Sequence, residues 1–145
     1  MIPKNTISAV LDMPLEKGWL RVRDFNGLPG WHPAVIESTI ERGEPHDRIG
    51  CVRSYRRRDG LALREQLLAL DDVAHSMTYR LLDQPIPVKN YVATLRLTRI
   101  TESDRTFAEW QAWYDCAASD EATLREAIDG VFRAGLEFLN ASTVK

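Results

Sequence analysis

Three side chains that can hold or transfer a proton are placed by strand alternation on the inner face of a predicted sheet. His32 precedes a proline, which favours an extended backbone, and it has the parity of the apolar positions that follow. Glu65 lies between the inward positions Leu63 and Leu67, and Tyr91 begins the apolar set of its own strand. An imidazole with an ordinary pKa of about 6.5, a carboxylate and a phenol suit general acid–base chemistry or the polar end of a ligand.

The orientation of a fourth polar residue, Arg53, depends on the register of a hairpin. The Asp-Gly pair at 59–60 is a strong hairpin signal. A two-residue loop there pairs Ser54 with Glu65, so Arg53 and Glu65 face inward together only with a bulge or an odd-length loop. An inward Glu65 needs Arg53, Tyr91, water or a polar ligand as a partner, because an unpaired buried charge is unfavourable.

Alternating apolar residues fill the middle of the chain, between two helical patterns, and are typical of antiparallel strands with one face in water. They predict strands at residues 34–41, 50–57, 61–70, 74–82, 90–100 and 105–114, and a weaker alternation before the first helix predicts one more at 4–11. In segment 34–41 the less charged set is expected to face inward, and it consists of Ala34, Ile36, Ser38 and Ile40.

The segment before His32 is rich in turn residues. A short amphipathic helix is expected over 14–24, and Asn26-Gly27 should end it in the left-handed conformation. Residues 28–31 (LPGW) fit a type II turn, with proline second and glycine third. These turns would leave the His32 ring on the inner side of the following strand.

A long C-terminal helix should cover the inner face of the sheet. Ser119 can cap its first turn, and its apolar stripe comprises Leu124, Ile128, Val131, Phe132, Gly135, Phe138 and Leu139. One helix cannot fill a strongly bent sheet of six or seven strands, so a cavity is expected. Leu28, Pro29 and the stretch 83–88 would rim its mouth.

Length and composition restrict the class of protein. The 145 residues predict a single domain, 1–145, with 44% hydrophobic and 28% charged residues and a net charge of −2. This balance gives no reason to expect nucleic acid, and no apolar run approaches the roughly 20 residues that cross a bilayer. Cys51 and Cys116 show no metal-ligand or redox spacing. We therefore expect a cytoplasmic protein without metal, cofactor or membrane insertion.

Five stretches resemble, in chain order, those of the START-like, pollen-allergen-like superfamily (SRPBCC), in its polyketide cyclase/dehydrase and lipid-transport branch. They are DFNGLPGWHP (24–33), GCVR (50–53), LREQLLALDD (63–72), PVKNYVATL (87–95) and AEW (108–110). The resemblance implies an α+β helix-grip fold, in which a six- to seven-stranded antiparallel sheet curves around a long C-terminal helix. It also implies two short helices after the first strand and an internal cavity.

The same order of elements is distantly similar to the plant abscisic-acid receptors. There a basic residue opening the second strand, an Arg after G-C-x, a Glu before R-L and a Tyr in N-Y contact the ligand. On the matching motifs these positions are His32, Arg53, Glu65 and Tyr91. His32 stands where a Lys is expected, and the tight hairpin at 58–60 replaces the receptors' longer gate loop. A hormone-gated switch is therefore not expected.

Two interpretations of these four residues stay open. In one, Arg53 and Glu65 only hold two strands together, and His32 bonds to the backbone. In the other, the four residues anchor the polar end of a ligand, with apolar or aromatic lining from Ile36, Leu67, Tyr79, Trp110, Val131 and Gly135.

Two functions fit the second interpretation. The first is binding or transfer of a small hydrophobic or aromatic ligand with a polar end in the internal cavity. The second is a cofactor-free cyclase, aromatase or dehydratase, in which His32, Glu65 or Tyr91 moves protons. A weaker third is a regulatory protein whose cavity is filled by large side chains. Phe107 and Trp113 on the outer face suggest either a homodimer or packing against the chain's own first strand.

Overall fold

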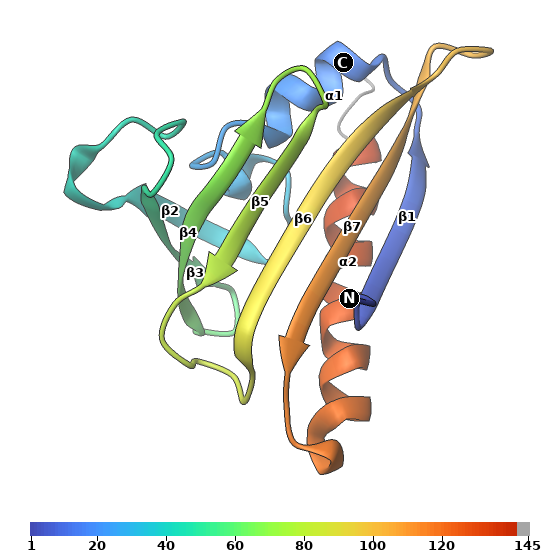
Figure 1. Ribbon diagram of the computed structural model, residues 1–145. Coiled ribbons are helices and arrows are strands. Elements are labelled where there is room, and N and C mark those ends of the chain that lie inside the picture. Colours follow the sequence, from blue (N-terminus) through green and yellow to red (C-terminus); the bar gives the residue numbers. More distant parts are fainter. Residues whose placement is uncertain (142–145) are drawn as a thin grey trace.

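A curved antiparallel sheet of seven strands packs against one long helix in the computed structural model, which describes residues 1–141 (Figure 1). The strand order is β1-β7-β6-β5-β4-β3-β2, so β1 and β2 form the two edges and the sheet is not a closed barrel. The predicted helix-grip fold is confirmed. Its elements are β1 (Asn5–Leu11), α1 (Leu15–Val22), η1 (Leu28–Gly30), β2 (Val35–Ile40), η2 (Glu41–Gly43), β3 (Val52–Arg57), β4 (Ala62–Asp71), β5 (Ser76–Leu81), β6 (Lys89–Ile100), β7 (Arg105–Asp115), η3 (Ala118–Asp120) and α2 (Glu121–Ala141). The predicted domain 1–145 ends four residues beyond the described part.

Strand alternation places the core. In β7 the buried positions alternate, at Thr106, Ala108, Trp110, Ala112 and Tyr114, and the last four face α2 across the concave side of the sheet. The Trp110 ring stacks on Phe132 of α2 with ring centroids 4.3 Å apart. The core therefore lies between the sheet and α2, as expected from the period of two residues in the strands and of 3.6 residues in the helix.

The apolar stripe of α2 differs from the prediction near its end. Buried residues recur every four positions at Leu124, Ile128, Phe132 and Leu136, whereas the predicted Phe138 is 42% exposed. The prediction missed Leu136, because several apolar residues crowd the last turns and the periodicity alone does not choose among them. Ser119, the predicted cap, lies in the short 3-10 turn η3 that precedes the helix.

The connection to His32 also differs in its local geometry. Gly27 has φ −87° and residues 28–30 form the 3-10 turn η1, so neither the left-handed cap nor the type II turn is present. The His32 backbone N–H donates to Leu28 O at 2.8 Å, which closes this turn and directs the chain into β2.

A bulge in β2 reverses the predicted faces of its first residues. The register against β3 shifts between Val35 and Glu37, so Val35 is buried and Ile36 is 41% exposed. The inward orientation predicted for Ile36 is wrong, because a bulge adds one residue and alternation cannot anticipate it.

The β3–β4 hairpin resolves the question of Arg53. Arg57 N–H donates to Leu61 O, which leaves a three-residue loop, 58–60, with Gly60 at φ +91°. The left-handed backbone at the last loop position is readily adopted by glycine. This odd-length loop pairs Arg53 directly with Glu65, and both side chains face the concave side.

Candidate functional site

A cavity of about 70 Å³ lies beneath the sheet, between β3, β4, β5, β6 and the middle of α2. Its apolar lining includes Leu28, Val35, Leu63, Trp110, Ile128 and Phe132, and its polar lining is described below. Partly exposed residues (Arg57, Leu81 and Ile86) mark its mouth near the β3–β4 hairpin and the β5–β6 connection. Leu28 and Ile86 therefore border the cavity where the sequence placed its rim.

The inner end of the cavity contains three polar residues that pair with one another, which we call the interior cluster: Arg53, Tyr55 and Glu65. Arg53 donates to Glu65 Oε1 from Nε at 2.9 Å and from Nη2 at 2.7 Å. The Tyr55 hydroxyl donates to Glu65 Oε2 at 3.1 Å. Both oxygens of the carboxylate are thus occupied by protein donors.

Aromatic rings surround the Arg53 guanidinium. Its central carbon lies 4.1 Å from the Phe25 ring centroid and 4.9 Å from that of Tyr79, and Nη1 donates to Phe25 O at 3.1 Å. Burial opposes the charge, but the Glu65 carboxylate outweighs it and raises the pKa of Arg53. Cation–π contacts add to this stabilisation because the guanidinium is desolvated.

Both ring nitrogens of His32 are hydrogen-bonded to backbone groups. The Ala34 N–H donates to Nδ1 at 3.2 Å, so Nε2 carries the proton and donates to Val131 O in α2 at 2.8 Å. Burial lowers the pKa of His32, and the charges of Arg57 and Arg53 lower it further. His32 is therefore neutral at pH 7 and links β2 to the helix.

Gly135 makes this link possible. A Cβ at that position would lie 2.7 Å from His32 Cδ2 and 3.0 Å from Trp110 Cζ3. The glycine thus makes room for two protein rings, and it does not itself border the cavity.

Two phenolic hydroxyls keep unused hydrogen-bonding capacity inside the cavity. No hydrogen bond joins the Tyr91 hydroxyl to another group of residues 1–141, while its ring stacks on Tyr114 with ring centroids 5.7 Å apart. Tyr79 accepts from Trp110 Nε1 at 3.1 Å, and its own O–H has no acceptor in the same range. Burial raises the pKa of both tyrosines, so both remain protonated donors.

Most of the residues that the sequence proposed for ligand binding border the cavity, and three do not. His32, Arg53, Glu65, Tyr79, Tyr91, Trp110 and Val131 border it. Ile36 is exposed, and Leu67 and Gly135 are buried beside the lining. Tyr55 and Arg57 were missed, although they share the parity of Arg53 along β3 and alternation identifies them once Arg53 is known to face inward.

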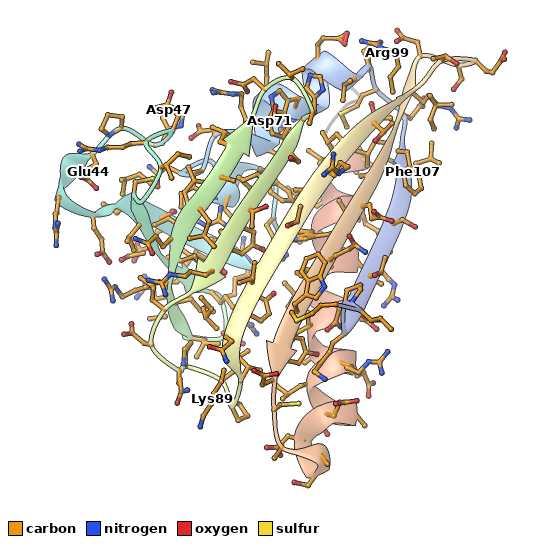
Figure 2. All side chains as sticks on the ribbon, in the orientation of Figure 1. Glu44, Asp47, Asp71, Lys89, Arg99 and Phe107 are labelled. Atoms are coloured by element: carbon orange, nitrogen blue, oxygen red, sulfur yellow. The ribbon has the colours of Figure 1, made fainter. Side chains whose placement is uncertain are left out.

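Metal-ligand clusters and membrane-spanning helices are two further features to compare with the sequence. Within residues 1–141 no three His, Cys, Asp or Glu side chains lie together in a way that could hold a metal ion. In the same range no helix is long and apolar enough to cross a membrane. Phe107 lies on the outer face of β7 with 37% of its surface exposed (Figure 2).

Comparison with known proteins yields one family and several similar structures. A family model described as "Polyketide cyclase / dehydrase and lipid transport" matches residues 3–142. No curated protein is significantly similar in sequence to this chain.

Solved structures share the whole fold. XoxI from Bacillus cereus is 26% identical, with a TM-score of 0.86 over 97% of this chain and 94% of its own. A Thermobifida fusca protein is 30% identical, with a TM-score of 0.83 over 93% of this chain and 89% of its own. The di-domain ARO/CYC BexL from the BE-7585A biosynthetic pathway is 13% identical, with a TM-score of 0.79 over 94% of this chain and 44% of its own. At that identity BexL shows the fold alone.

Proposed function

The chain belongs to the polyketide cyclase/dehydrase and lipid transport family, and we propose that it binds a small, mostly apolar molecule with one polar end in the cavity. The observation that carries this proposal is the division among the polar groups of the lining. Arg53, Glu65 and His32 are occupied by protein partners, whereas no hydrogen bond joins the Tyr91 hydroxyl to another group of residues 1–141. A ligand acceptor atom would complete that hydrogen bond, and the surrounding apolar lining would bury the remainder of the ligand.

The same division favours binding over catalysis. A general base needs a free lone pair within reach of the substrate. The His32 lone pair already accepts the Ala34 N–H, and the Glu65 oxygens accept Arg53 and Tyr55. The cyclase or dehydratase alternative would therefore have to use the second lone pair of Glu65 Oε2, which accepts from Tyr55 alone, whereas ligand binding needs no proton acceptor.

The size of the cavity restricts the ligand. Ligand pockets typically measure about 300–1,000 Å³, and an engineered cavity of about 150 Å³ holds benzene. At about 70 Å³, this cavity accepts a six-membered ring only when side chains at the mouth move aside. Arg57, Leu81 and Ile86 are partly exposed and can do so, whereas Arg53 and Trp110 are held by several contacts.

Native mass spectrometry of the freshly purified protein tests the proposal, followed by extraction and identification of any bound molecule. Titration of ¹⁵N-labelled protein with benzyl alcohol, a small ring with one polar end, gives a second readout. We expect backbone shifts confined to β3–β6 and the middle of α2. We also expect Tyr91→Phe to weaken benzyl alcohol binding by about 5- to 10-fold, the value of one buried hydrogen bond.

Tyr114→Phe is the matched control. It removes the hydroxyl of the ring stacked on Tyr91, which donates to Asn5 Oδ1 at 2.7 Å away from the cavity. It should lower stability and leave binding unchanged. An empty protein that also shows no shifts with benzyl alcohol would contradict the proposal and favour a regulatory protein with a filled cavity. A cytoplasmic location and a homodimer stay predictions.

A further inference from the structure

Arg57 is the charged residue at the mouth of the cavity. It follows Arg53 and Tyr55 at every second position of β3 and faces the same side, opposite Val35 of β2. Its side chain is 30% exposed, in contrast to 2% for Arg53. Arg57 therefore lies at the boundary between the apolar lining and solvent, where a ligand head group would enter last.

The hydrogen bonds of Arg57 are incomplete. Nη2 lies 2.5 Å from Asp59 Oδ2 in the hairpin loop, whereas Nε is buried and has no hydrogen-bond partner within residues 1–141. A buried N–H of a charged group that lacks an acceptor is destabilising by more than a neutral one. The Nε–H thus requires an acceptor that the described residues do not supply.

The charges around the cavity are unequal. Arg53, Arg57 and Glu65 are the charged residues of its lining, and His32 is neutral. Glu65 is occupied by Arg53 and Tyr55, and Asp59 is 54% exposed on the solvent side of Arg57. Arg57 is therefore the charged residue of the lining whose counter-charge, Asp59, lies outside the cavity.

The unused polar atoms of the lining differ in what they can bind. The Arg57 Nε–H can only donate, whereas the Tyr79 and Tyr91 hydroxyls can donate or accept. A ligand end that only donates would leave the Arg57 Nε–H unpaired. A ligand end that accepts and carries negative charge meets both requirements.

We propose that the bound molecule is a small monocarboxylic acid, with its carboxylate on the Arg57 guanidinium and its hydrocarbon part inside the cavity. This inference rests on the proposed binding function and adds the chemical class of the ligand. A carboxylate fits the free side of one guanidinium, because its two oxygens match two N–H groups in one plane. A second negative charge on the ligand is disfavoured, since Asp59 already lies against the same guanidinium.

The test compares benzoate with benzyl alcohol, which share a ring and differ in the charge of the polar end. Titrations at pH 7 of ¹⁵N-labelled wild type should give at least about tenfold tighter binding of benzoate, the scale of a charge-assisted hydrogen bond. The Arg57 Nε–H resonance should shift with benzoate and change little with benzyl alcohol. Arg57→Gln should remove the preference for benzoate while leaving benzyl alcohol binding within about twofold.

Arg56→Gln is the matched control, since it removes the same charge from the neighbouring position on the opposite face, where Arg56 pairs with Glu37. It should keep the preference for benzoate, apart from a small loss that salt screens. Equal binding of the two probes by wild type, or a preference that survives Arg57→Gln, would overturn the inference and leave the binding function standing. Binding of neither probe would overturn both.

Discussion

Two arginine–carboxylate pairs with nearly the same chemistry lie on opposite faces of the sheet, one joining β3 and β4 and the other joining β4 to Glu41 of η2. On the inner face, Arg53 of β3 pairs with Glu65 of β4, and the Tyr55 hydroxyl donates a hydrogen bond to the other oxygen of the Glu65 carboxylate. On the outer face, Arg64 of β4 donates to Glu41 at 2.7 and 2.9 Å, and the Ser54 hydroxyl of β3 donates to the same carboxylate. The side chains are 2% and 6% exposed in the inner pair, and 42% and 31% exposed in the outer pair.

The two pairs differ in solvent exposure and not in hydrogen-bond geometry. The outer carboxylate can be solvated when its arginine is lost, and the Arg64 and Ser54 hydrogen bonds hold the pKa of Glu41 at about 2. The inner charges cannot be solvated by water in this way, because Phe25, Tyr55 and Tyr79 surround the guanidinium. The comparison indicates that the interior cluster contributes mainly to stability, whereas the proposed ligand recognition would depend on the groups outside this cluster.

The largest expected effect is the loss of the inner carboxylate. Glu65→Gln leaves the Arg53 charge buried without a counter-charge and should lower the free energy of unfolding by about 3–5 kcal/mol. The outer equivalent, Glu41→Gln, should lower it by about 1 kcal/mol or less. Urea denaturation monitored by circular dichroism measures both.

A double variant, Arg53→Met with Glu65→Leu, sharpens this test. Replacing both partners by apolar groups should recover most of the lost stability, because no charge is then left buried. Equal losses for Glu65→Gln and Glu41→Gln would refute the distinction between the two faces.

A smaller effect is expected where α2 meets the inner face. Gly135→Ala forces a methyl group against His32 and Trp110 and should lower the free energy of unfolding by about 1–3 kcal/mol, partly offset by the better helix propensity of alanine. Gly130→Ala on the same helix meets nothing within 4 Å and should stabilise by up to about 1 kcal/mol. Thermal denaturation of the two variants should therefore shift in opposite directions, and a common direction would contradict the close contact with His32.

The smallest expected effect is on the pH dependence of the unfolding free energy, which should differ between His32 on the inner face and Glu41 on the outer face. Burial holds the pKa of His32 below its ordinary value of 6.5, so the folded protein binds this proton less readily than the unfolded chain. The stabilising contribution of neutral His32 is complete above about pH 6.5 and declines as the pH falls below it. Unfolding free energies measured from pH 7.5 to 5 should therefore decline more steeply for wild type than for His32→Gln.

Glu41, in the outer pair, affects stability at a lower pH than His32 does. Its pKa is lowered from 4.5 to about 2, so its contribution is present above about pH 4.5 and is lost between there and pH 2. Glu41→Gln should follow the wild-type pH profile down to about pH 5 and depart from it only in stronger acid. A wild-type profile from pH 7.5 to 5 that parallels the His32→Gln profile would show that the imidazole is not held neutral by burial.

The sequence by itself determined the architecture and the inner face of most strands. Period-two alternation identified the buried residues of β7, and Tyr91 and Glu65 were correctly oriented by parity alone. These features depend on local periodicity, which burial against one face imposes on the sequence. The same parity identifies Arg57 once one inward residue of β3 is known.

Tertiary structure alone decided which polar groups are available. The three-residue loop at 58–60 brought Arg53 opposite Glu65, and the bulge in β2 turned Ile36 outward, since each shifts the register by one residue. Whether His32 faces a ligand or the helix was decided by Gly135 and Val131 O, about 100 residues away in the chain. Hydrogen-bond satisfaction is a property of atoms brought together from distant segments, so no local pattern could show that His32 is occupied while the Arg57 Nε–H lacks a partner within residues 1–141.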